Sequence, residues 1–66
     1  MKISRWEFEK ELDGFINAAL SASSKETARQ YLNKADGKID GYDNIPDDLK
    51  RLYKQKVREA QMKLDI

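Results

Sequence analysis

Hydrophobic residues recur at helical spacing in three segments of this chain. In the first segment, five of them fall within one arc when residues are placed 100° apart: Phe8, Leu12, Phe15, Ile16 and Ala19. Charged and small residues occupy the opposite side. The pattern predicts an amphipathic helix over about residues 4–22.

A start signal precedes this stripe. Ser4 and Glu7 have the S-x-x-E spacing of a capping box, in which the serine hydroxyl and the glutamate carboxylate satisfy backbone N–H groups of the first turn. Ile3 and Phe8 also have the spacing of a hydrophobic staple. Together these two signals predict that the first helix begins at Ser4.

A second stripe follows after a short serine-rich connection. It consists of Ala28, Tyr31, Leu32, Ala35 and, at its end, Ile39. Ser23 with Glu26 forms another capping box, although Ser24 is an equally good cap. The Asp36-Gly37 pair is a typical helix stop, because glycine takes the left-handed conformation without steric cost. We therefore predict a helix over 24–36 and a loop over 37–45.

The third segment begins at a proline. Pro46 suits the first position of a helix, and the two acids after it favour the helix dipole. The apolar stripe is Leu49, Tyr53, Val57, Ala60 and Leu64, which predicts a helix over 46–64. Three helices with short connections predict an all-α fold, a small three-helix bundle that forms a single helical domain over residues 1–66.

Composition argues against chemistry. The chain has neither histidine nor cysteine, and its 13 Lys and Arg nearly balance 12 Asp and Glu. The usual general base and the most reactive nucleophile are therefore missing. We expect a protein that is not an enzyme, uses no cofactor and binds no metal. Because no apolar run is long enough for export or membrane insertion, we expect no membrane partner and a cytoplasmic location.

One short segment resembles part of a calcium-binding loop. Residues 36–40, Asp-Gly-Lys-Ile-Asp, resemble the middle of an EF-hand loop. In that register, however, Leu32 and Lys34 take the first and third ligand positions and offer no carboxylate. We therefore predict that this loop does not bind calcium specifically.

Residues 24–32, Ser-Lys-Glu-Thr-Ala-Arg-Gln-Tyr-Leu, form a segment that is similar to the recognition helix of helix-turn-helix proteins. In that family, a helix of this kind enters the major groove and its polar residues contact phosphates and bases. Degenerate features, such as a short turn without glycine, weaken the similarity. The similarity implies an alternative function, a DNA-binding regulator. The candidate nucleic-acid-binding residues lie on the second helix and on a basic ridge of the third: Lys25, Arg29, Gln30, Asn33, Arg51, Lys54 and Arg58.

Trp6 departs most clearly from the core pattern. It lies on the side of the first helix opposite the apolar stripe, together with Lys10, and Leu52 and Met62 lie off the stripe of the third helix. Tryptophan is enriched in binding hot spots. We therefore predict a protein-binding regulatory module, such as an adaptor, inhibitor or assembly factor, whose partner is another protein or a second copy. An exposed patch around Trp6 would favour this function, whereas an aligned basic ridge would favour DNA.

Overall fold

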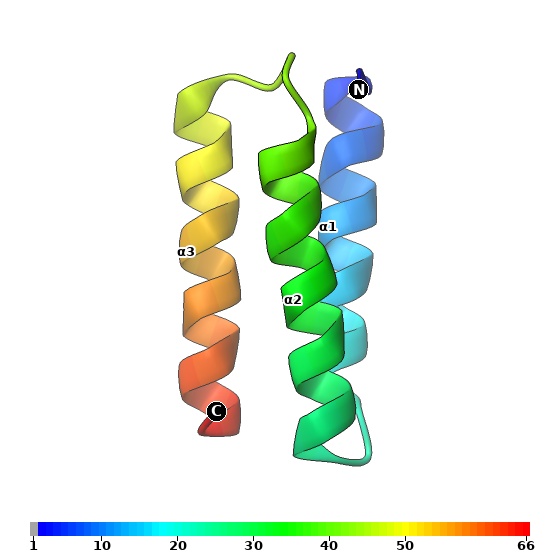
Figure 1. The fold of residues 1–66 in the computed structure, drawn as a ribbon, viewed down its shortest axis with the longest axis vertical. Helices are drawn as coiled ribbons and strands as arrows, with labels where there is room; N and C mark the ends of the chain where they lie inside the picture. Colours follow the sequence, from blue (N-terminus) through cyan, green and yellow to red (C-terminus); the bar gives the residue numbers. More distant parts are fainter. Residues whose placement is uncertain (1) are drawn as a thin grey trace.

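A computed structural model describes residues 2–66, which form three helices in an up-down-up bundle (Figure 1). The helices are α1 (Arg5–Leu20), α2 (Lys25–Gly41) and α3 (Asp47–Leu64), and no strand is present among the described residues. α1 and α3 run in the same direction, and α2 runs antiparallel to both. The prediction of a three-helix bundle is confirmed.

The core follows the three predicted stripes closely. Its buried residues are Phe8, Leu12, Ile16 and Ala19 of α1, Ala28, Leu32, Ala35 and Ile39 of α2, Tyr42 and Ile45 of the connection, and Leu49, Tyr53, Val57 and Ala60 of α3. Phe15, Tyr31 and Leu64, which the stripes also include, are half-buried at its edge. The connection after α2 therefore contributes to the core, which the sequence pattern had not indicated.

The predicted end of the second helix is wrong. α2 continues through Asp36 and Gly37 to Gly41, so the predicted loop over 37–45 shrinks to residues 42–46. The inner stripe explains the continuation, because Ile39 and Tyr42 extend the spacing set by Leu32 and Ala35 and are buried. Burying two large side chains outweighs the cost of about 1 kcal/mol for a glycine inside a helix.

The helix starts agree with the predictions in place but differ in detail. The Glu7 N–H donates to Ser4 Oγ at 3.1 Å, and the Ser4 hydroxyl donates to Glu7 Oε1 at 2.8 Å. At α2, Ser24 is the cap, since the Thr27 N–H donates to its hydroxyl at 3.2 Å.

Pro46 is the N-cap of α3 and not its first helical residue. α1 ends at Leu20, two residues before the predicted end.

Aromatic packing and one polar clamp hold the end of the bundle where the chain begins. Phe8 lies between Tyr42 and Tyr53, with edge-to-face ring pairs at centroid separations of 5.9 and 5.4 Å. The Ile3 N–H donates to Asn44 Oδ1 at 3.1 Å, and Asn44 Nδ2 donates to the Ile3 carbonyl at 2.8 Å. These contacts fix the start of α1, and with it the position of Trp6.

Candidate protein-binding site

Trp6 lies in the first turn of α1 and points away from the core. Its side chain is 66% exposed, unusual for the largest apolar side chain of the molecule. The Lys10 ammonium group lies 4.8 Å from the centre of the indole ring, one helical turn further on, in a cation–π contact. This contact restrains the ring on the helix surface, so binding a partner there costs less side-chain entropy.

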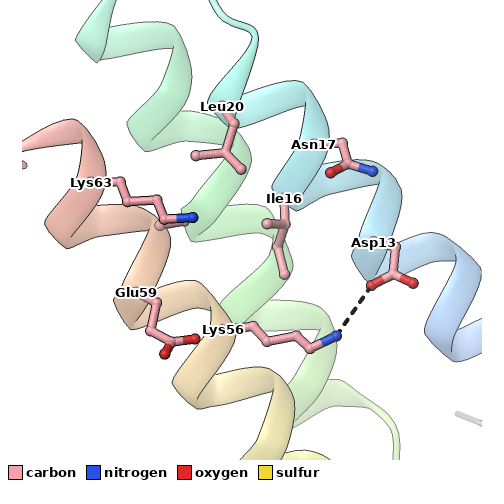
Figure 2. A pocket seen from close by; sticks show the side chains of 8 residues that line it. Asp13, Ile16, Asn17, Leu20, Lys56, Glu59 and Lys63 are labelled. Atoms are coloured by element: carbon pink, nitrogen blue, oxygen red, sulfur yellow. Dashed lines mark ion pairs between the residues drawn. The ribbon is translucent and has the colours of Figure 1, made fainter.

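A groove runs between α1 and α3, which pack less closely on each other than either packs on α2. Its volume is about 200 Å³, and Figure 2 shows Asp13, Asn17 and Leu20 on the α1 side and Lys56, Glu59 and Lys63 on the α3 side. Ile16 points into it, and Leu20 and Lys63 point toward one another across it. The groove is smaller than ordinary small-molecule pockets, which suits a contact surface better than an enclosed ligand.

The walls of this groove carry opposite charges that meet at its middle. Asp13 Oδ1 lies 4.0 Å from Lys56 Nζ, and both side chains are about half exposed (Figure 2). Such an exposed pair contributes little to stability. It does show the relative heights of the two parallel helices, because Asp13 and Lys56 lie at nearly the same level.

Trp6 and Leu52 extend the two walls toward the beginnings of their helices. Trp6, Asp13 and Leu20 follow at intervals of seven residues, so they share one edge of α1. Leu52, Lys56 and Lys63 are spaced four and seven residues apart, so they share an edge of α3, on which Glu59 also lies. Leu52 is 47% exposed and Leu20 is 41% exposed. We call these six residues the α1–α3 face: Trp6, Asp13, Leu20, Leu52, Lys56 and Lys63.

The structure separates Met62 from the other predicted protein-binding residues. Met62 is 75% exposed, but it lies in a shallow hollow with Arg51, Gln55 and Arg58 on another side of α3. Trp6 and Lys10 share a hollow on α1 with Asp13 and Asn17, which also line the α1–α3 groove, and Leu52 lies one turn before Lys56 on α3. Sequence reasoning missed Leu20, although its spacing of fourteen residues from Trp6 was a usable signal.

The residues of the DNA-binding alternative lie on α2 and α3, where carboxylates interrupt the cations. Lys54 Nζ donates to Asp36 Oδ1 at 2.7 Å and to Asp40 Oδ2 at 3.1 Å, and Lys25 lies 3.8 Å from Asp65. The hydrogen bond with Asp36 raises the pKa of Lys54, with a smaller opposing effect of burial. Arg29, Gln30, Asn33, Arg51 and Arg58 are exposed. A phosphate approaching Lys54 would have to displace two carboxylates, which weakens the predicted ridge.

The remaining perturbed groups are tyrosines at the edge of the core. Burial, followed by hydrogen bonding to Asp13, raises the pKa of Tyr53 to about 12. The Tyr42 hydroxyl donates to Glu11 Oε1 at 2.9 Å, and that hydrogen bond is the main reason its pKa is raised. Both hydroxyls therefore stay protonated near neutral pH. Within residues 2–66, no cluster of three or more acidic side chains could hold a metal ion.

Comparison of the chain with family models, curated proteins and solved structures finds no match. None of the three helices described for residues 2–66 is both long enough and apolar enough to cross a bilayer. The site must therefore be interpreted from its own geometry.

Proposed function

We propose that this protein is a small, non-enzymatic, cytoplasmic interaction module that binds another protein or a second copy of itself through the α1–α3 face and acts as an adaptor, inhibitor or assembly factor. The observation that carries the proposal is the exposure of Trp6, the largest apolar side chain of the molecule, which is 66% exposed to solvent. Leu52 and Leu20 add two further exposed apolar contacts on the same face.

Energetics support this choice of surface. Keeping a tryptophan in water gains no burial energy for the fold, whereas burying it in an interface commonly contributes 2 kcal/mol or more. The acidic and basic side chains around the groove would form the polar rim that surrounds such a hot spot. DNA binding through α2 remains the second candidate, and the pairing of Lys54 with Asp36 and Asp40 ranks it lower.

The test is affinity capture with matched variants. Immobilised parent protein, Trp6→Ala and Met62→Ala are exposed to cytosol, and captured proteins are identified by mass spectrometry. We expect a partner that the parent and Met62→Ala retain equally, and whose affinity falls roughly thirtyfold in Trp6→Ala. Met62 is the control because it is more exposed than Trp6 but lies outside the α1–α3 face. Equal capture by all three proteins would refute the proposed surface.

A further inference from the structure

We infer that the partner of the α1–α3 face is a second copy of this chain, related by a two-fold axis parallel to the helices, so that α1 of each copy packs against α3 of the other. This inference rests on the proposed function, since it names the occupant of the same face. It is carried by the charges and the register of the two helices that form the face.

The two edges of the face are complementary in charge. The α1 edge carries Asp13 and Glu9 with Lys10 on its outer side, and the α3 edge carries Lys56, Glu59 and Lys63, so the net charge is −1 on the first edge and +1 on the second. A two-fold axis along the helices places the acidic edge of one copy against the basic edge of the other, and does so twice. Asp13 then meets both Lys56 of its own chain and Lys56 of the second copy, in a cluster of two positive and two negative groups.

The apolar residues fall into the same register. α1 and α3 run in the same direction (Figure 1), and the contact between Asp13 and Lys56 shows that these two residues lie at the same level. Trp6 lies seven residues before Asp13, and Leu52 lies four residues before Lys56. The levels of Trp6 and Leu52 therefore differ by three residues, which is about 4.5 Å along the helix axis and within reach of an indole side chain. Trp6 of one copy therefore meets Leu52 of the other.

The opposite end of the face is consistent with this arrangement. Leu20 and Lys63 lie seven residues after Asp13 and Lys56, respectively, and both line the groove. In the parallel dimer, Leu20 of one copy faces the aliphatic stem of Lys63 of the other, while the ammonium group reaches solvent. Each exposed apolar residue of the face is thus covered.

The antiparallel alternative fails on charge. A two-fold axis across the helices would place Trp6 against Leu20 of the second copy, which is a good apolar match. It would also place Asp13 against Asp13 and Lys56 against Lys56 at the centre of the interface. Like charges in direct opposition are strongly unfavourable in an interface. The parallel arrangement avoids both pairs.

The size of the face sets the expected strength of the dimer. The molecule measures 33 × 16 × 16 Å, so one long side is smaller than a standard interface of roughly 800 Å² per partner. We therefore expect weak, reversible dimerisation.

Charge reversal tests the inference by sedimentation equilibrium from micromolar to millimolar concentration. Asp13→Lys and Lys56→Glu should each weaken self-association at least about tenfold, because each creates like-charge contacts in its own homodimer. An equimolar mixture of the two variants should dimerise, since every cross-chain contact at the centre is then attractive. Lys34→Glu, which makes the same change of charge as Lys56→Glu on α2 outside the face, should dimerise like the parent. Circular dichroism verifies that each variant is folded.

Cross-linking tests the orientation, because the chain contains no native cysteine. Mixed Asn17→Cys and Glu59→Cys chains should form a heterodimeric disulfide efficiently, since these positions lie at the same level on opposite edges. Mixed Asn17→Cys and Glu9→Cys chains should do so only in the antiparallel arrangement. Preferential linkage of the second mixture, or no rescue by mixing the charge variants, would overturn the inference. A parent protein that is monomeric at millimolar concentration would also overturn it, while leaving capture of another protein through Trp6 as a separate test of the proposed function.

Discussion

Lys54 of α3 forms an ion pair with Asp36 of α2, with 2.7 Å between Nζ and Oδ1. The sequence had predicted that Lys54 belongs to a basic ridge and that Asp36 ends a helix. Asp40, one turn further along α2, accepts from the same ammonium group at 3.1 Å. Both carboxylates can reach Lys54 only because α2 stays helical beyond Asp36. The two contacts thus depend on the longer helix, and they weaken the anion-binding surface.

The continuity of α2 predicts that Gly37→Ala stabilises the protein. Gly37 lies inside the helix, and an added Cβ would meet nothing within 4 Å. We expect the free energy of unfolding to rise by about 0.5–1 kcal/mol, as measured by denaturant titration. Gly14→Ala in α1, which has the same open surroundings, is the matched control. A loss of stability in Gly37→Ala alone would indicate a left-handed glycine and a helix that ends at residue 36.

The hydrogen bond at the start of α1 predicts a measurable cost for removing its cap. Ser4→Ala removes the acceptor of the Glu7 N–H, so the free energy of unfolding should fall by about 0.5–2 kcal/mol. Ser24→Ala should have a similar effect at α2, whereas Ser23→Ala should have almost none, because Ser24 provides the cap. An unchanged denaturation midpoint in Ser4→Ala would mean that the first turn of α1 is frayed.

The raised pKa of Tyr53 predicts a loss of stability in strong base. An unfolded tyrosine deprotonates near pH 10, whereas Tyr53 in the fold holds its proton until about pH 12. The unfolded state thus binds fewer protons between these values, and the free energy of unfolding falls by about 1.4 kcal/mol for each pH unit. The contribution is fully present below pH 10. In Tyr53→Phe, the free energy of unfolding should fall less steeply with pH. Lys54 titrates equally in both proteins, so it does not contribute to the difference. Parallel curves for the two proteins would rule the effect out.

The interrupted ridge predicts weak binding to nucleic acid. At physiological salt we expect no binding to mixed-sequence duplexes tighter than about 10 μM. Fluorescence anisotropy over a range of salt concentrations measures this directly. Submicromolar affinity that falls steeply with salt and is lost in Arg29→Ala would make α2 the functional surface.

Local periodicity predicted most of the fold, and the errors have physical causes. The starts of α1 and α2 followed from serine caps and that of α3 from a proline, and all three signals are local. The end of α2 depended on burial of Ile39 and Tyr42 against other helices, and a local glycine signal does not report such packing. The exposure of Trp6 was predictable from its angle on α1. The level of Trp6 relative to the residues of α3 was not, because the register between two helices depends on their tertiary packing, which the contact of Asp13 with Lys56 shows only in the structure.

The sole tryptophan makes the central claim directly measurable, because the intrinsic fluorescence of the protein reports Trp6 without a label. In dilute protein we expect emission typical of a solvated indole, which shifts to shorter wavelength as a captured partner or a second copy is added and covers the ring. Leu52→Ala should shift the concentration dependence without altering the dilute spectrum. Emission that is already at short wavelength in dilute protein, or that stays unchanged while association proceeds, would contradict the assignment of Trp6 to the binding surface.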